Sequence, residues 1–167
     1  GIHAPGITIN RYCASGLESI AMATAKIRTG MAECIIAGGT ESMSLVPTAG
    51  WKTVPAYSIA KEEPDYYLSM GLTAEAVAKE YNISREDQDL FSYNSHVKAG
   101  NAIKEGYFKS GILPVSVNEV YLDAKGKKQQ RSFVVDTDEG VRADTSVEGL
   151  AKLKPAFAAG GCVTAGN

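Results

Sequence analysis

The sequence feature that most constrains the fold is an uninterrupted apolar run, Cys34 to Ala37, that ends in a pair of glycines. Such a run is typical of a strand covered on both faces of an α/β sheet. Ahead of it, the β-branched segment Ile7 to Ile9 predicts another strand, and the alanine-rich stretch Cys13 to Arg28 predicts a largely buried helix that stops before Gly30. The first 40 residues therefore predict a β-α-β unit and an α/β fold class.

The amino-acid composition changes from about Glu41, where prolines and aromatic residues recur and predict long loops. We place a domain boundary there. Beyond it, helical and strand patterns alternate, without an internal repeat. The predicted elements are helices over 73–81 and 84–104 (the second with Ser84 and Asp87 as a capping box), strands over 112–117 and 132–135, and a short helix capped by Thr145 with Glu148 before Pro155.

Charge and apolar content exclude several classes of function. The 167 residues carry a formal net charge of −2 with scattered Lys and Arg, which gives no field for nucleic acid. No apolar run reaches the roughly 20 residues that a membrane span needs, so we expect an intracellular protein without a membrane span. The three cysteines fit neither a disulfide framework nor a Cys-x-x-Cys zinc site. We therefore expect separate thiols and no metal.

Cys13 is the best placed of the three cysteines to react. It lies between a predicted strand and the start of a helix, where free N–H groups and the helix dipole favour a thiolate and can receive an oxyanion. A small buried residue is the alternative interpretation. Cys34, inside the apolar run, is predicted to be core, and Cys162, in a glycine-rich stretch, is predicted to pack near a tight turn.

Other groups that bear chemistry have plainer interpretations. The two histidines are His3, near the start of the sequence, and His96, in the middle of a polar helical stretch, and a surface or packing role is predicted for each. The pair Gly38-Gly39 lacks a phosphate-loop pattern, so a tight strand exit is the better interpretation. The basic residues near the second predicted strand indicate a solvated hairpin in preference to a phosphate site; they are Lys125, Lys127, Lys128 and Arg131.

Two motifs together resemble the nucleophile segment and the following strand of thiolases. They are Asn10–Leu17 (NRYCASGL) and Ala37–Ser44 (AGGTESMS), and their order and spacing also match. The resemblance continues along essentially the whole chain, although it covers well under half of a typical thiolase. The further matching segments are Met70–Glu75 (MGLTAE), Ile83–Asp89 (ISREDQD), Leu153–Phe157 (LKPAF) and Val163–Asn167 (VTAGN).

The resemblance implies a place for each part of the chain in a five-layered α-β-α-β-α enzyme. Residues 1–42 would belong to the N-terminal core with its nucleophile helix, 43–160 to the inserted loop domain that grips coenzyme A, and 161–167 to the return into the core. It implies that Cys13 attacks the ketone of a 3-ketoacyl-CoA and becomes acylated as acetyl-CoA leaves, after which CoA takes the acyl group.

The resemblance also implies three contacts with coenzyme A. Met70 would lie near the pantetheine arm, Arg142 near the nucleotide, where its fixed charge suits an anion, and Ala165 where the chain passes the pantetheine. Two positions depart from the pattern of some thiolases: Ser69 replaces a His and Gly149 replaces a Ser. These departures leave the CoA contacts and the subfamily open.

Our leading functional hypothesis is a degradative 3-ketoacyl-CoA thiolase of fatty-acid β-oxidation. The alternatives are a biosynthetic acetoacetyl-CoA thiolase and a non-catalytic thiolase-like protein that binds CoA or lipid. CoA would be a substrate, with no covalently bound cofactor. The family's activating His and its second Cys have no counterpart in this sequence, so we expect an internal fragment that is inactive by itself. The resemblance further implies a homodimer or homotetramer, cytoplasmic in a bacterium or in a mitochondrial or peroxisomal matrix.

Overall fold

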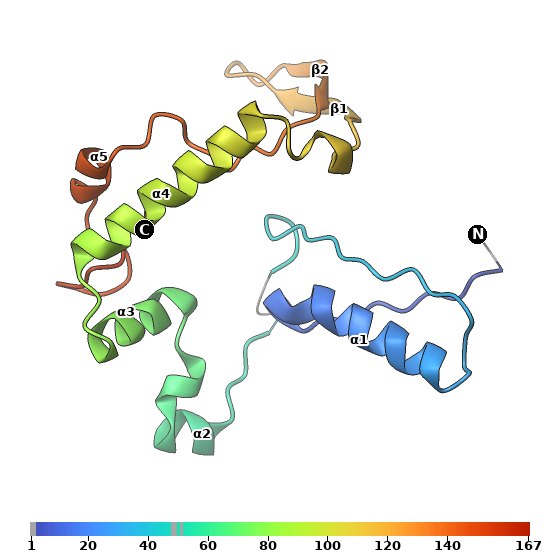
Figure 1. Ribbon diagram of the computed structural model, residues 1–167, viewed down its shortest axis with the longest axis horizontal. Coiled ribbons are helices and arrows are strands. Elements are labelled where there is room, and N and C mark those ends of the chain that lie inside the picture. The colour runs from blue at the N-terminus through green and yellow to red at the C-terminus, as the bar shows by residue number, and fades with distance from the viewer. Residues whose placement is uncertain (1–2, 48–49, 51) are drawn as a thin grey trace. The chain divides into compact units, whose positions relative to one another are not determined.

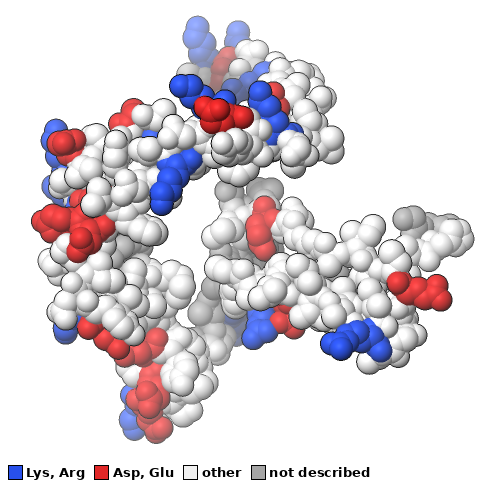
Figure 2. Space-filling model, viewed as in Figure 1, with Lys and Arg blue, Asp and Glu red and all other residues white. Residues whose placement is uncertain are grey.

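The computed structural model describes residues 3–47, 50 and 52–167, and the chain divides into two compact units, Gly1–Ile59 and Ala60–Asn167 (Figure 1). The domain bounds expected above, 1–42, 43–160 and 161–167, refer to a complete enzyme and stay a prediction. Figure 2 shows acidic and basic side chains interspersed over the face in view. Among the described residues, no helix combines the length and the apolar character needed to cross a bilayer.

The first unit is built around helix α1, Ser15–Arg28, which follows a short 3-10 turn, η1, at Tyr12–Ala14. The helix ends as its sequence predicts. Gly30 takes a positive φ of 73°, and Met31 N–H reaches back to the carbonyl of Lys26 at 2.9 Å. This is the left-handed stop that glycine favours, since it has no Cβ to clash with the preceding carbonyl.

The prediction that α1 is largely buried is wrong for this chain. The helix has no buried residue, and Leu17 and Ile20 are 74% and 56% exposed. The reason is that few residues of the first unit pack on the helix. Its apolar content nevertheless remains, so α1 presents an uncovered apolar surface within this unit.

The two strands predicted beside this helix do not form. Neither Ile7–Ile9 nor Cys34–Ala37 is hydrogen-bonded into a sheet, and Figure 1 shows both as open coils. Cys34, predicted to be core, is exposed, and Ile36 is 98% exposed. A strand exists only through its neighbours, and no backbone hydrogen bond joins either segment to another part of the described chain. Both strand predictions are therefore wrong for the described chain, because no other segment pairs with either run.

The second unit begins with short helical turns and continues with two longer helices. The bounds are α2 Tyr57–Glu62 (which straddles the division between the units), η2 Pro64–Tyr67, α3 Met70–Glu80, α4 Arg85–Lys104 and η3 Lys109–Gly111. The two predicted helices are confirmed as α3 and α4, and α3 begins three residues earlier than expected. The shift has a local cause, because Ser69 accepts a hydrogen bond from Leu72 N–H and so caps the helix. Ser84 caps α4, with its Oγ 3.0 Å from Asp87 N.

A two-stranded antiparallel hairpin follows, with β1 at Val115–Leu122 and β2 at Lys128–Val135. β1 begins three residues later than the predicted range 112–117 and continues to Leu122, whereas β2 ends at Val135 as predicted but begins four residues earlier than the predicted range 132–135. The turn explains the extension, because Asp123 Oδ1 accepts hydrogen bonds from the N–H groups of Lys125 and Lys127, each at 2.9 Å, and this fixes the register. The hairpin is solvated, as predicted, and Arg131 pairs with Glu119 instead of standing free.

The chain ends in helix α5, Val147–Ala151, and a return segment that runs from Gly160 to Asn167. The predicted cap of α5 is wrong by one residue, because Ser146 and not Thr145 accepts the hydrogen bond, from Gly149 N–H at 3.1 Å. The buried residues of this unit gather where α3, α4, α5 and the return segment meet. They are Ala78, Asp89, Leu150, Val163 and Thr164.

Candidate active site and coenzyme-binding surface

Cys13 lies in the η1 turn that leads directly into α1, and it is exposed. Side chains on either side hold this turn. Asn10 Oδ1 accepts a hydrogen bond from Tyr12 N–H at 2.9 Å, and Ser15 Oγ accepts one from Arg11 N–H at 2.8 Å. The Ser15 hydroxyl also donates to the carbonyl of Tyr12 at 2.7 Å. The thiol is therefore presented at the N-terminal end of a helix on a turn with a defined shape.

The residue directly before the cysteine has an unusual backbone. Tyr12 has a φ of +50°, in the left-handed region that residues with a Cβ rarely enter. Such a conformation costs on the order of 1 kcal/mol and persists where the surroundings enforce it, which is most often at functional sites. Here the hydrogen bonds of Asn10 and Ser15 enforce it, and the result is that Cys13 projects from a sharp bend.

Among the described residues of the first unit, no base is hydrogen-bonded to this thiol. His3 is exposed near the start, and His96 lies on α4 in the other unit, where it accepts a hydrogen bond from Arg142. Arg11 forms an ion pair with Glu18 beside the turn. The described residues also contain no group of His, Cys, Asp or Glu arranged to hold a metal ion. The described residues of the first unit thus present an exposed thiol at the start of a helix, without a hydrogen-bonded base beside it.

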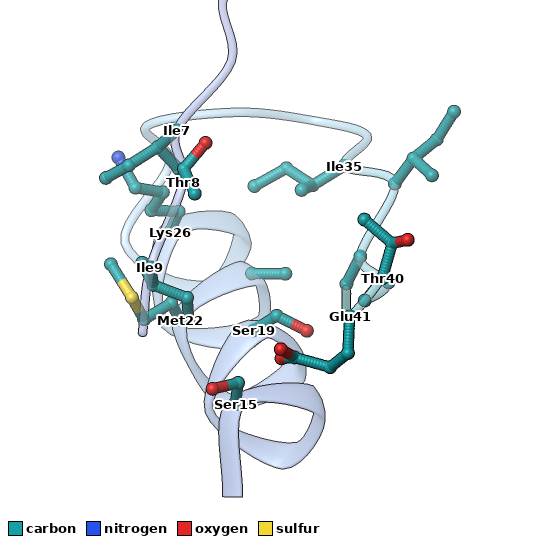
Figure 3. Close-up of a pocket in the computed structure, with 15 residues that line it drawn as sticks. Ile7, Thr8, Ile9, Ser15, Ser19, Met22, Lys26, Ile35, Thr40 and Glu41 are labelled. Carbon is teal, nitrogen blue, oxygen red and sulfur yellow. The ribbon is translucent and has the colours of Figure 1, made fainter. Parts of the chain in front are cut away.

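A cavity of about 450 Å³ opens along the flank of α1, but it is not the pocket of Cys13 (Figure 3). Its walls come from the helix and from the two segments predicted as strands. In Figure 3, Ser19 and Met22 of α1 line one side, with Ile7 and Ile35 contributed by the two segments. Gly38-Gly39 belongs to the same lining. Cys13 is not among the lining residues, so the cavity and the nucleophile are separate features.

The three residues that the resemblance assigns to coenzyme A all lie in the second unit. Met70 is the first residue of α3 and is 72% exposed. Arg142 is exposed in the connection between β2 and α5, and Ala165 is exposed in the return segment. Each is thus accessible to a ligand. The departure noted at Ser69 has a structural counterpart, because this serine caps α3.

The turn around Ala165 is held by its two polar neighbours. Thr164 Oγ1 accepts hydrogen bonds from the N–H groups of Gly166 and Asn167, at 3.1 and 3.2 Å. Asn167 Oδ1 accepts one from Thr164 N–H at 2.7 Å. Thr164 is 4% exposed, so a buried residue anchors the exposed alanine beside it. Ala165 therefore stands on a fixed backbone.

A buried ion pair connects this turn to α4 and α5. Asp89 is 2% exposed, and both of its carboxylate oxygens accept from Arg85 Nε, at 3.0 and 2.9 Å. Asn167 Nδ2 donates to the same carboxylate at 2.7 Å. Arg85 Nη2 donates to the carbonyls of Leu150 and Leu153, at 2.7 and 3.0 Å. The charges are paired, and no buried side-chain nitrogen or oxygen of the described residues lacks a hydrogen-bond partner, which is the condition for burying an ion pair at tolerable cost.

A second carboxylate, Glu75 of α3, holds the start of the return segment. It accepts hydrogen bonds from the N–H groups of Cys162 and Val163, at 3.0 and 2.9 Å, and the Cys162 thiol lies 3.3 Å from it. Glycine at position 161 leaves room for this carboxylate, because a Cβ there would overlap it and would force the Glu75 side chain to shift. The thiol of Cys162 also accepts from Gln88 Nε2 of α4 at 3.2 Å. Cys162 directly follows the turn that Gly161 N–H closes on the carbonyl of Ala158 at 3.1 Å.

We expect the Glu75 tie to weaken in acid. The backbone N–H groups of Cys162 and then Val163 hold the pKa of Glu75 below its ordinary value of 4.5. A depressed pKa in the folded state contributes stability that is complete above the unfolded-state pKa and is lost as the pH falls through the folded-state value. The free energy of local opening, measured by hydrogen exchange at the amides of Cys162 and Val163, should therefore fall below about pH 4.5.

In the variant Glu75→Gln this acid dependence should be much reduced, because the amide does not titrate. Asp123→Asn is the matched control. The pKa of Asp123 is also lowered, chiefly by the Gln129 side chain and the Lys127 N–H, but Asp123 lies in the hairpin turn. Equal acid dependence at Cys162 and Val163 in wild type and Glu75→Gln would contradict the assignment.

Sequence reasoning missed the residues that hold the return segment. Arg85 and Asp89 have helical i, i+4 spacing, which usually marks a surface ion pair. Glu75 and Asn167 lie inside matched motifs without any separate signal. Only their tertiary partners, 78 to 88 residues away in sequence, give them a role. The one usable signal was the charged pair Arg85 and Asp89, because both residues lie inside the matched segment Ile83–Asp89.

Comparison with known proteins places this geometry in context. A family model described as "Thiolase, N-terminal domain" matches residues 1–167. The 3-ketoacyl-CoA thiolase of Bacillus subtilis (strain 168) is 51% identical over 163 residues, which cover 98% of this chain and 42% of that protein.

Two solved structures resemble the chain closely, each with a TM-score of 0.74. The acetyl-CoA acetyltransferase of Bacillus anthracis is 36% identical and is matched over 95% of this chain and 41% of that one. The dimeric peroxisomal thiolase of Saccharomyces cerevisiae is 34% identical over 95% of this chain and 39% of that one. The α/β fold class predicted from the sequence is thereby confirmed. The chain spans less than half the length of each of these proteins.

Proposed function

Because this chain belongs to the thiolase family, we propose that it is the nucleophile-bearing part of a 3-ketoacyl-CoA thiolase of fatty-acid β-oxidation. The observation that carries the proposal is the exposed Cys13, set at the start of α1 directly after a residue with a left-handed backbone. The relatives that the chain matches are more than twice as long as the match. The activity therefore belongs to the full-length protein.

The proposed reaction is a two-step acyl transfer through Cys13. Its thiolate attacks the 3-keto carbon of a 3-ketoacyl-CoA, the bond between C2 and C3 breaks, and acetyl-CoA leaves after its C2 carbanion takes up a proton. The acyl group is now a thioester on Cys13. The thiolate of a second CoA attacks that thioester, which releases the shortened acyl-CoA and restores the cysteine. The family's His and second Cys, which lie beyond this sequence in the resemblance, would move the protons.

The second unit would contribute contacts to CoA. We propose that Met70 and Ala165 lie along the pantetheine arm and that Arg142 meets the phosphates of the nucleotide. Their exposure and the fixed backbone around Ala165 support this assignment. The Arg142 guanidinium can donate several hydrogen bonds in one plane, which suits a phosphate group.

The second candidate is a biosynthetic acetoacetyl-CoA thiolase, favoured by the 36% identity to an acetyl-CoA acetyltransferase. A series of 3-ketoacyl-CoA substrates of increasing chain length would separate the two activities. Strict preference for acetoacetyl-CoA would overturn our first choice.

By analogy with the dimeric relative we also propose a homodimer. We further propose a cytoplasmic location if the protein comes from a bacterium, which is the kind of organism that the Bacillus subtilis relative comes from.

The central test is the intact mass of the full-length protein before and after addition of a 3-ketoacyl-CoA. We expect one acyl adduct that is lost on addition of CoA, with the modified peptide containing Cys13. The variant Cys34→Ser, which removes another exposed thiol, should still form the adduct. A non-catalytic CoA-binding relative would give no adduct, and an adduct on a different cysteine would contradict the assigned nucleophile.

A further inference from the structure

The backbone of Arg142 is held by a histidine that the proposed chemistry does not use. His96, on α4, accepts a hydrogen bond through Nδ1 from Arg142 N–H at 3.2 Å, across 46 residues of sequence. An imidazole nitrogen accepts only when it carries no proton, so the neutral ring must have its proton on Nε2. The ring is half-buried, whereas Arg142 itself is exposed.

A second contact places the same segment against the same helix. Gly100 follows His96 by one turn of α4, and a Cβ at Gly100 would lie 3.6 Å from Val141 Cγ1. Residues four apart on a helix share one face, so His96 and Gly100 together form a seat for Val141 and Arg142. Val141 is half-buried there. Outside this seat, residues 136–146 form no helix or strand.

The position of this seat within the second unit is set by α4, which is held by contacts at its N-terminal end. The N-terminal end of α4 carries Arg85 and Asp89, which connect it to α5 and to the return segment. The hydrogen bond that His96 accepts from Arg142 N–H therefore locates the Arg142 backbone relative to the turn that bears Ala165. The guanidinium remains free to extend into solvent from a backbone position that is set.

We propose that His96 is a positioning residue for Arg142: it fixes the backbone from which the guanidinium reaches the phosphates of the CoA nucleotide. The inference rests on the proposed function and deepens it. His96 acts through Arg142 and touches no reacting atom. Its loss should therefore weaken the binding of substrates that carry the nucleotide and leave the chemical step unchanged.

The test uses the full-length enzyme and two forms of one substrate: the 3-ketoacyl-CoA, and the same acyl group on pantetheine, which lacks the nucleotide. For His96→Ala we expect the KM for the CoA thioester to rise about three- to tenfold with kcat unchanged, as for the loss of one hydrogen bond. For the pantetheine thioester, kcat/KM should change less than about twofold. His96→Asn should restore most of the affinity, because the Asn Oδ1 can accept near the place of Nδ1.

Arg142→Ala separates failure of the inference from failure of the assignment on which it rests. It should show the same selective loss, and His96→Ala added to it should cause no further loss. If Arg142→Ala affects both substrates equally, the assignment of Arg142 to the nucleotide is wrong. If Arg142→Ala is selective but His96→Ala has no effect, or weakens both substrates alike, then His96 is not a positioning residue.

Discussion

Replacing Cys13 by serine in the full-length protein is expected to lower kcat for thiolysis by at least about a thousandfold, the largest effect among the variants considered. A serine hydroxyl is a far weaker nucleophile than a thiolate at neutral pH, and loss of a covalent nucleophile typically removes most of the rate enhancement. The backbone should be undisturbed, because the turn is held by Asn10 and Ser15 and not by the cysteine side chain. Initial rates with a 3-ketoacyl-CoA and CoA measure the loss.

The matched control is Cys34→Ser, which changes an exposed thiol outside the helix turn. It should retain activity within about twofold. Binding of CoA to Cys13→Ser, measured by calorimetry, should also be retained, since the proposed contacts lie in the other unit. Near-normal turnover of Cys13→Ser would show that the chemistry uses a different group.

The second large effect is expected on stability. In Asp89→Ala, Arg85 and Asn167 lose the carboxylate that they share, and the positive charge remains partly buried, with the Arg85 side chain 22% exposed. Breaking such a pair from one side typically costs about 3 kcal/mol or more. We expect about 2–4 kcal/mol less free energy of opening at the amides of residues 164–167 and of α5. Native-state hydrogen exchange of the full-length protein measures it.

Glu119→Ala is the control for this comparison, because it breaks the ion pair with Arg131 on the hairpin. Both partners are more than one third exposed, so the cost should be below about 1 kcal/mol. Exchange near residues 164–167 should not change in this variant. If Asp89→Ala were as mild as Glu119→Ala, the buried pair would not be what anchors the return segment.

Local signals in the sequence predicted the local structure of this chain well. Gly30 ends α1, Ser84 caps α4, and Asp123 holds the turn between the two predicted strands. These features depend on residues within about five positions of one another, so their physics is contained in a short stretch of sequence. The errors of this kind were small, such as the cap of α5 at Ser146 in place of Thr145.

Features that need a distant partner were predicted poorly. The run Cys34–Ala37 has the composition of a buried strand, but burial and pairing depend on elements that the chain does not bring to it. For the candidate site, Cys13 came from its position before a predicted helix together with the motif resemblance, and the three CoA contacts came from the resemblance alone; all four remain predictions. The residues that hold the return segment, such as Asp89 and Glu75, could not be predicted because their hydrogen-bond partners lie far away in the sequence.

The tethered turn at Ala165 has a consequence for the thermodynamics of ligand binding. The side chains of Thr164 and Asn167 accept hydrogen bonds that fix its backbone without any ligand, and the Asp89 carboxylate anchors Asn167 in turn. Ordering a flexible loop would cost about 1–2 kcal/mol of conformational entropy for each residue fixed. Here that entropy has already been lost on folding. A ligand that binds along Ala165 would therefore contact a backbone that is already ordered, and more of its contact energy would appear as affinity.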